Sequence, residues 1–344
     1  MAEYTSRSFD LLTLGQLLLR LSPPDNDRLS RGDTFVKQVG GAELNVAVGA
    51  SLLGLRTGVI SKLPSHDIGS FMKGKIRSFG VSDDFFMYDD SPSARVGIYY
   101  YENGAYPRKP KVIYDRMNSS FFSLNIDEIP KEVYTASKCF HTTGITLALS
   151  PQIRETTIEM IKRFKAAGTL VSFDVNFRGN LWTGEEAKEC IEQILPYVDI
   201  FFCSEDTARL TFKKTGTARE MMKSFTEEYP ISIVASTQRI VHSPKSHTFG
   251  SIIYDARKDI YYEEEPYRDI DVVDRIGSGD AYISGALYGL LTSDFDCEKA
   301  VRYGNATSAV KNTIPGDLPS SNLEEIQTII KAHNQSGPQS EMAR

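Results

Sequence analysis

The stretch Val273-Asp274-Arg275-Ile276-Gly277-Ser278-Gly279-Asp280 joins a glycine-rich turn to an apolar segment that ends at Leu291. Apolar residues recur in that segment at helical spacing, at Ile283, Ala286, Leu287, Leu290 and Leu291. The spacing predicts a helix over 280–291. Glycines let backbone N–H groups point at one spot without obstruction by a Cβ atom. Together with the positive end of the helix, these donors form an anion site suited to phosphate.

Asp280 places a negative charge at the mouth of this predicted anion site. A pocket that only binds phosphate gains nothing from that charge. A pocket that transfers phosphate to a hydroxyl group needs a base for the hydroxyl proton. We therefore predict Asp280 as the catalytic base, with the backbone amides of Gly277, Ser278 and Gly279 stabilising the charge of the phosphate. The alternative is that Asp280 only caps the helix, since Asp is favoured in a first helical turn.

A second glycine pair lies far upstream, in GGAELNVAVGASLLG at residues 40–54. Gly40-Gly41 interrupt a strand-like run, and the following residues predict a helix over 42–53 that ends at Gly54. Asn45 is an amide in the first turns of this mostly apolar helix. A buried amide needs partners, because an unsatisfied one costs roughly 1–3 kcal/mol. Asn45 either bonds the neighbouring backbone or faces a cleft and binds a ligand hydroxyl.

The two glycine stretches together resemble the two signatures of the ribokinase-like sugar kinases, in both order and placement. The resemblance covers the chain from about Asp10 to Pro319. Within that family, the chain is similar to the 2-keto-3-deoxygluconate kinases. That likeness depends on GGAELN and on three further stretches: GIYYYENGAYPRKPKVIYDR at 97–116, DVNFRGNLW at 174–182 and VVDRIGSGD at 272–280. It implies transfer of phosphate from ATP, with Mg²⁺, to the 6-hydroxyl of a sugar acid. It leaves open whether a monovalent cation also takes part.

The resemblance and the pattern of the chain agree on the fold class. Predicted strands, among them 9–14 and 231–236, alternate with predicted helices before residue 90 and again after residue 137. This alternation indicates a mostly parallel sheet covered by helices on both faces. We expect one three-layer α/β/α domain with its ligands at the carboxyl ends of the strands. Two stretches, at about 16–39 and 94–117, interrupt this alternation of strands and helices. They predict a small β-sheet lid. The polar tail 335–344 is predicted to be disordered.

The resemblance also implies which residues contact the sugar acid. In the 2-keto-3-deoxygluconate kinases the matching positions are Gly41, Tyr99, Tyr114, Arg116, Arg178 and Asp280. Two guanidinium groups facing one pocket suit a carboxylate, which they grip with paired hydrogen bonds. Taken alone, each arginine is better explained by a surface ion pair. Tyr100 or Tyr101 takes the place of Tyr99 if the register shifts.

The residues predicted at the nucleotide site match the family pattern less well than those predicted at the sugar site. We assign to it Asp174, Asn176, Ser204, Thr237, Arg239 and Asn305, with Gly277 and Gly279. The family usually has an NxxE motif whose Glu acts on magnesium, whereas this chain has Ser204-Glu205-Asp206-Thr207. Glu205 and Asp206 are candidate metal ligands, although each step along a helix turns the side chain by ~100°. Thr237-Gln238-Arg239 stands where the family tends to have Thr-x-Gly.

Composition limits the classes of function. The chain has 344 residues, a net charge of −6 and no concentrated basic tract, so nucleic-acid binding has little support. The cysteines form no CxxC pair, and no apolar run approaches the ~20 residues that span a bilayer. We therefore expect a cytoplasmic protein without membrane or nucleic-acid partners. In the resembling family the lid often mediates dimer contact, which predicts a homodimer or a higher homo-oligomer. His242 and His247 are predicted to share a loop, without a third metal ligand nearby.

Two alternatives to a sugar-acid kinase stay open. One is a kinase of a neutral ketose or of another sugar. The other is a catalytically weak sugar-acid binding protein, which the altered segment 204–207 suggests and the intact Asp280 argues against. A dehydrogenase would need a dinucleotide fingerprint after a strand, which the sequence lacks.

Overall fold

Parallel strands form the centre of the molecule. The computed structural model describes residues 7–334. In this part of the chain the large sheet has the order β13-β12-β11-β10-β9-β8-β1-β4-β5, with β14 paired to β12. Neighbours from β11 to β5 are parallel, and β12 pairs antiparallel with β11, β13 and β14. The strands are β1 (Phe9–Leu14), β4 (Thr57–Pro64), β5 (Phe86–Asp89), β8 (Ser137–Thr143), β9 (Leu170–Asp174), β10 (Ile200–Phe202), β11 (Ile233–Ser243), β12 (Ser246–Asp255), β13 (Ile260–Glu263) and β14 (Tyr267–Asp271).

Helices cover both faces of this sheet, because successive side chains of the buried strands point to opposite faces. In β1, Leu12 and Leu14 pack on one side and Leu11 on the other, all fully buried. The first face carries α3 (Val133–Ala136), α4 (Gly144–Ala148), α5 (Pro151–Ala166), α6 (Gly184–Glu192), α7 (Glu205–Leu210) and α8 (Ala218–Glu228). The second carries α1 (Ala42–Leu52), α9 (Ser278–Leu291), α10 (Cys297–Asn312) and α11 (Leu323–His333). Helix α2 (Asp67–Arg77) packs beside α1. The predicted three-layer fold is confirmed.

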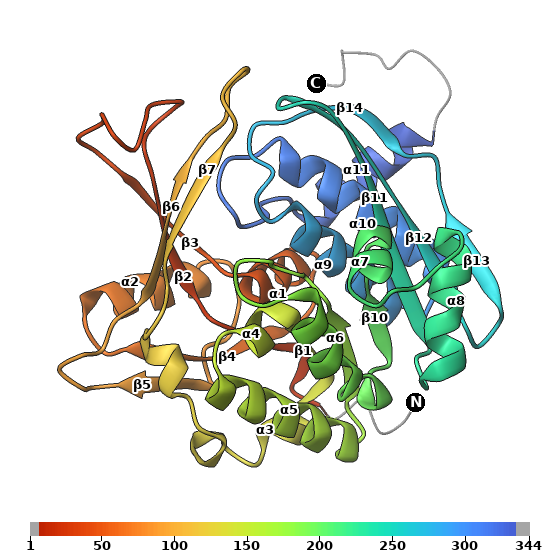
Figure 1. The fold of residues 1–344 in the computed structure, drawn as a ribbon, viewed down its shortest axis with the longest axis horizontal. Coiled ribbons are helices and arrows are strands. Elements are labelled where there is room, and N and C mark those ends of the chain that lie inside the picture. The colour runs from red at the N-terminus through yellow and green to blue at the C-terminus, as the bar shows by residue number, and fades with distance from the viewer. Residues whose placement is uncertain (1–6, 335–344) are drawn as a thin grey trace.

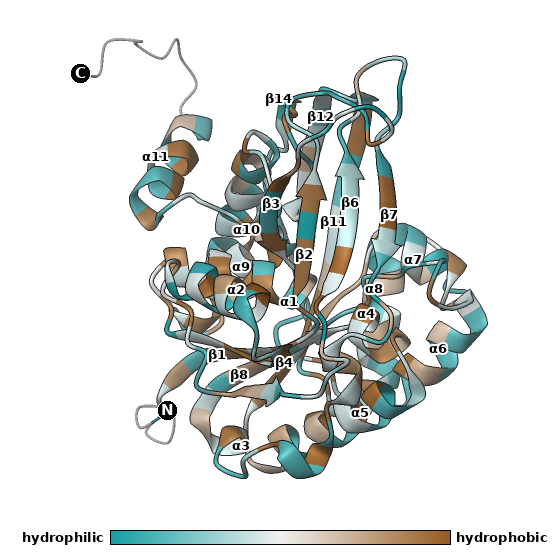
Figure 2. Ribbon diagram, turned by 90° about the vertical axis from the view of Figure 1, so that its left-hand side faces the viewer, coloured by the Kyte–Doolittle hydropathy of each residue, from teal (hydrophilic) through white to brown (hydrophobic). Residues whose placement is uncertain are grey.

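A separate small sheet has the order β3-β2-β6-β7. Its strands are β2 (Leu18–Ser22), β3 (Val36–Gly40), β6 (Gly97–Glu102) and β7 (Lys111–Asp115). Figure 1 shows this sheet and the β11–β12 hairpin rising on the same side of the molecule, with α1 and α9 between their bases. Figure 2 shows the hydrophobic colouring concentrated on interior strands such as β1 and β4. The small sheet was expected from the sequence, whereas its role as a lid stays a prediction. The predicted disorder of 335–344 lies outside the described residues.

The β11–β12 hairpin differs most from the sequence-based expectation. A strand was predicted over 231–236, but β11 continues to Ser243 and pairs along its length with β12. Its outer half carries exposed residues, so hydrophobic burial alone did not reveal it. The two histidines do not share a loop, as the sequence analysis had it. His242 lies on β11 and His247 on β12, and His242 Nε2 is 2.8 Å from Thr248 Oγ1. No helix of the described residues is long and apolar enough to cross a bilayer.

Candidate active site

The turn before α9 is held in a conformation that requires glycine. Gly277 has φ of 81°, in the left-handed region, and it precedes the first residue of α9. A Cβ atom at this position would lie 2.1 Å from the carbonyl oxygen of Asp317. At Gly279, in contrast, a Cβ atom would meet nothing within 4 Å. We call residues 274–279 the anion loop.

The backbone donors of the anion loop differ in one respect from the prediction. The N–H of Ser278 is already used, because it donates to the carbonyl oxygen of Arg275 at 3.2 Å. The N–H groups of Gly277 and Gly279 have no hydrogen-bond partner within residues 7–334. Of the three backbone donors that the sequence predicted, those of Gly277 and Gly279 therefore remain for an anion.

Asp280 is oriented by the helix that follows the first glycine pair. Asn45, on α1, donates through Nδ2 to Oδ2 of Asp280 at 2.7 Å. Burial raises the pKa of Asp280 to about 6, while the bond from Asn45 and the charge of Arg178 oppose this shift. The carboxylate is thus held by a partner from another helix instead of capping its own. Asn45 thus bonds a side chain of another helix instead of the neighbouring backbone, and its contact with a ligand hydroxyl stays a prediction.

A cavity of about 420 Å³ lies between the small sheet and the carboxyl ends of the large sheet, and we call it the central cavity. It brings together most of the predicted residues from distant parts of the chain. They are Gly41, Asn45, Tyr99, Tyr114, Arg116, Asp174, Asn176, Arg178, Arg239, Gly277, Ser278, Gly279 and Asp280.

A second cavity of about 260 Å³, the side cavity, adjoins the first. Its lining includes Ser204 and Thr237, and it shares Asp174, Asn176, Arg178 and Gly279 with the central cavity. Burial raises the pKa of Asp174 to about 7, and the charge of Asp280 adds to this effect. Asp174 thus stands where the cavities meet, and the negative charge of Asp280 in the central cavity makes its ionisation less favourable. A larger cavity of about 790 Å³ between the small sheet and the β11–β12 hairpin contains none of the predicted site residues.

The two predicted arginines reach the central cavity in different ways. Arg116 is 6% exposed, and its Nε donates to Oε1 of Gln16 at 2.8 Å. Burial lowers the pKa of Arg116, and among the described residues no carboxylate forms an ion pair with it. Arg178 is exposed at the cavity mouth and donates to the carbonyl oxygen of Phe177 at 3.1 Å. Neither arginine is in the surface ion pair that was its alternative.

Tyrosines of the small sheet form one wall of the central cavity. Tyr99 and Tyr114 are paired across β6 and β7, with ring centroids 5.8 Å apart. The hydroxyl of Tyr99 donates to the carboxylate of Asp317, so Tyr99 presents its ring rather than its hydroxyl. Tyr101 lies against Arg20, at 4.3 Å from the guanidinium carbon to the ring centroid. Tyr99 is the tyrosine at the cavity, without the shift of register that the sequence left open.

Three predicted residues do not reach either cavity. The amide of Asn305 is buried and bonded to Ser251 at 2.7 Å and to Glu264 at 3.2 Å, so it has no free edge for a base. Glu205 turns to Arg209, at 2.9 Å, and Asp206 lines neither cavity. The rotation of side chains around α7 explains this, since Ser204 and Thr207 face the side cavity instead. Within residues 7–334 no group of three or more His, Cys, Asp or Glu side chains could hold a metal ion.

The sequence analysis missed several residues of the central cavity. Arg275 lines it without a polar partner for its side chain among the described residues, although it stands inside the first motif. Glu43 is buried at its base and accepts hydrogen bonds from Thr143 and Thr146, at 2.7 Å and 2.6 Å. Asp317 follows a loop without a motif, and its contacts come from the small sheet. Of these residues, only Arg275 could have been found from the sequence, because it lies within the anion loop.

Comparison with known proteins agrees with this geometry. Residues 8–324 match the pfkB family carbohydrate kinases. The chain is 34% identical to a 2-dehydro-3-deoxygalactonokinase of Haloferax volcanii over 322 residues, which is 94% of this chain and 96% of that protein. It is 28% identical to the 2-dehydro-3-deoxygluconokinase of Bacillus subtilis, over 90% of this chain and 91% of the relative.

Comparison with solved structures points to the same group of kinases. The crystal structure of a 2-dehydro-3-deoxygluconokinase from Thermotoga maritima superposes with a TM-score of 0.88 at 30% identity, covering 94% of this chain and 99% of that chain. The cavity between the small sheet and α9, the Asp280 carboxylate held by Asn45 and the match over nearly the whole sequence lead to one assignment. The chain belongs to the pfkB family of carbohydrate kinases.

Proposed function

We propose that this carbohydrate kinase transfers the γ-phosphoryl group of ATP to the 6-hydroxyl of 2-keto-3-deoxygluconate, which is the same compound as 2-dehydro-3-deoxygluconate. The names of relatives at 34% and 28% identity support a 2-dehydro-3-deoxy sugar acid as the substrate class. The structural neighbour from Thermotoga maritima, at 30% identity, is named for the gluconate, whereas the relative at 34% identity is named for its galactonate epimer, so the substrate panel below includes both compounds.

The observation that carries the proposal is the unpaired guanidinium of Arg116. A buried cation without a counter-ion is costly, because burial removes its hydration. Among residues 7–334 the one hydrogen bond of its guanidinium is to Gln16; Glu43 acts on it by charge without forming an ion pair, and Arg116 lines the central cavity. Arg178 approaches the same cavity from β9's carboxyl end. A substrate carboxylate would supply the missing negative charge and accept hydrogen bonds from both side chains. A neutral sugar would not.

The chemistry follows from the position of Asp280. The substrate hydroxyl gives its proton to the Asp280 carboxylate as its oxygen forms a bond to the γ-phosphorus. The bond from that phosphorus to the bridging oxygen of ADP breaks, and ADP leaves with the electron pair. The N–H groups of Gly277 and Gly279 stabilise the charge on the transferred group. Asn45 keeps the carboxylate aimed at the hydroxyl.

Asp174 supports binding of the nucleotide and its metal. A Mg²⁺ ion bound to ATP commonly keeps several waters and uses one or two protein carboxylates. Asp174 is the carboxylate at the junction of the two cavities and would hold the ion there, beside the negative charge of Asp280. Mg²⁺ supplies charge neutralisation for the phosphates when it is bound. Asn176, Ser204, Thr237 and Arg239 are proposed nucleotide contacts, as are the glycines of the anion loop. We further propose that the small sheet acts as a lid over the central cavity, that the protein forms a homo-oligomer, and that it is located in the cytoplasm.

A substrate panel tests it. ADP release would be measured with ATP and Mg²⁺ against 2-keto-3-deoxygluconate, its galactonate epimer, 5-dehydro-2-deoxygluconate and fructose. We expect the highest kcat/KM for 2-keto-3-deoxygluconate. The replacement Arg178→Ala should raise KM for the acids far more than for any neutral sugar. Arg163→Ala is the matched control, because Arg163 is an exposed arginine on α5 paired with Glu159.

The outcomes separate the alternatives. Preference for the galactonate epimer would correct the substrate but keep the class. A preference for fructose, or an equal effect of Arg178→Ala on neutral and acidic sugars, would overturn the carboxylate role. A melting temperature that rises with a sugar acid, without any turnover, would identify the protein as a sugar-acid binding protein.

A further inference from the structure

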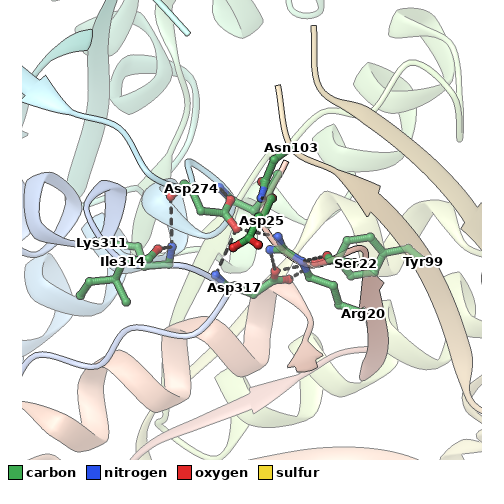
Figure 3. Close-up of polar contacts among 11 residues, drawn as sticks. Arg20, Ser22, Asp25, Tyr99, Asn103, Asp274, Lys311, Ile314 and Asp317 are labelled. Carbon is green, nitrogen blue, oxygen red and sulfur yellow. Dashed lines mark hydrogen bonds and ion pairs between the residues drawn. The ribbon is translucent and has the colours of Figure 1, made fainter. Parts of the chain in front are cut away.

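A fully buried lysine lies beneath the anion loop. Lys311, near the end of α10, is 1% exposed and lines neither the central cavity nor the side cavity. Its ammonium donates to the carbonyl oxygens of Asp274, at 3.2 Å, and Ile314, at 3.1 Å. Figure 3 shows the two contacts, one to the start of the anion loop and one to the segment that follows α10. Lys311 thus joins two stretches of backbone that meet at the site.

The second stretch fixes the glycine turn directly. The N–H of Gly316 donates to Oδ2 of Asp274 at 3.1 Å, and the carbonyl of Asp317 occupies the space where a Cβ of Gly277 would lie. The backbone N–H of Asp274 itself donates to the carbonyl oxygen of Asn312 at 3.1 Å. A displacement of residues 312–317 would therefore move the two free N–H groups of the loop.

Charge balance explains why a cation is needed at this point. Arg20 forms ion pairs with Asp274, at 2.6 Å, and with Asp317, at 2.8 Å. Figure 3 shows Arg20 between these two carboxylates and Lys311 on the far side of Asp274. All four side chains are at most 4% exposed. With Lys311 the cluster holds two cations and two carboxylates. Without it, one buried negative charge would stand beside an incoming phosphate.

The monovalent cation that the family resemblance left open does not fit here. Such an ion is held by converging carbonyl and carboxylate oxygens that replace its hydration shell. The two carbonyl oxygens that converge beside the anion loop, those of Asp274 and Ile314, both accept from Lys311. The ammonium group has the charge of a potassium ion and takes the same oxygen partners.

We infer that Lys311 is a positioning residue that acts as a built-in monovalent cation for the anion loop, so that this kinase works without added potassium. The inference depends on the kinase activity and not on which sugar acid is phosphorylated. A protein that carries its own cation at the end of α10 keeps the loop in one geometry at any potassium concentration.

The first test compares salts. Kinase activity and melting temperature of the wild type would be measured in potassium chloride and in tetramethylammonium chloride at equal ionic strength. We expect the same values in both. A wild-type rate that depends on potassium would overturn the inference, whether or not any variant folds. The melting measurement needs no substrate, so a wrong substrate assignment does not affect it.

The second test removes the ammonium. Lys311→Ala opens a space for a small cation, and we expect kcat in tetramethylammonium chloride to fall by about 10²-fold, since small misplacements of reacting groups cost that much. Potassium or ammonium chloride should restore most of the rate and raise the melting temperature of this variant. Full activity of the variant in tetramethylammonium, or a folded variant that no cation rescues, would contradict the role.

Lys62→Ala is the matched control. Lys62 is also buried, at 8% exposure, and it pairs with Glu128 at 2.6 Å away from the anion loop. This variant should lose stability equally in both salts and keep its rate. A potassium effect of the same size in Lys62→Ala would show that the rescue is not specific to Lys311.

Discussion

At the scale of single residues, the site depends on one carboxylate whose ionisation is difficult. Asp280 lines the central cavity and Asp174 lines both cavities, and burial raises the pKa of both carboxyl groups. A base with a pKa near the working pH combines a usable fraction of the ionised form with enough basicity to accept a proton.

The pH profile should report this carboxylate. Only ionised Asp280 can accept the hydroxyl proton, so kcat/KM for the sugar acid should rise with pH up to about 6 and level off above it. Initial rates between acidic and mildly basic pH would show the profile. A rate that stays constant well below the raised pKa would mean that another group takes the proton.

Replacement of Asp280 by Asn should remove turnover without unfolding the protein. Loss of a general base typically costs ~10²–10⁴-fold in rate. The raised pKa also fixes the sign of the effect on stability. The native state of Asp280 binds its proton more tightly than the unfolded state, so its contribution to stability is complete below the unfolded pKa and is lost as pH rises through about 6. At pH above that value, a neutral amide should be at least as stable as the carboxylate.

Rates and melting curves of Asp280→Asn at mildly basic pH test this prediction. Calorimetric titration with the sugar acid would show that binding is retained. Near-normal turnover would exclude Asp280 as the base, whereas a large drop in melting temperature would leave the lost activity to misfolding instead of chemistry.

At the scale of elements, the turn before α9 separates the structural from the functional glycines. Gly277 has a left-handed φ, and a Cβ atom added to it would lie 2.1 Å from the carbonyl oxygen of Asp317. The replacement Gly277→Ala should therefore lower both the melting temperature and the rate. A Cβ on Gly279 meets no protein atom and would project where the two cavities join. Gly279→Ala should therefore keep the melting temperature and raise KM for ATP. Thermal melts and kinetics of the two variants would distinguish them, and equal melting temperatures would refute the strain at Gly277.

Elements with strong local patterns could be predicted from the sequence, and elements that depend on distant partners could not. The strand over 9–14 has the predicted bounds, because its apolar run is buried on both faces. The outer part of β11 is exposed and gains its structure from β12, which no local pattern shows. The site divides in the same way. The glycine motifs indicated Asp280 and Asn45, whereas Lys311 and Asp317 look like ordinary surface residues until the fold surrounds them with opposite charges.

At the scale of the whole molecule, the small sheet has two different faces. Tyr99, Val112 and Tyr114 line the central cavity. On the opposite face, Tyr100 pairs with Ile113, and the ring of Phe35 lies 6.0 Å from that of Tyr100. Phe35 is 45% exposed and Ile113 is 55% exposed. This apolar outer face is where the proposed homodimer would form, since a partner chain would bury it.

The replacement Ile113→Lys tests the homodimer. A charge in the middle of an apolar interface is costly to bury, so we expect the variant to become monomeric at concentrations where the wild type is dimeric. Light scattering after size-exclusion chromatography would measure the mass. Leu210→Lys is the control, because Leu210 is 67% exposed at the end of α7, away from the small sheet. A dimer that survives Ile113→Lys, or a wild type that is monomeric, would exclude this face as the interface. If the small sheet also closes over the sugar, the monomeric variant should show a raised KM for the sugar acid with little change in the KM for ATP.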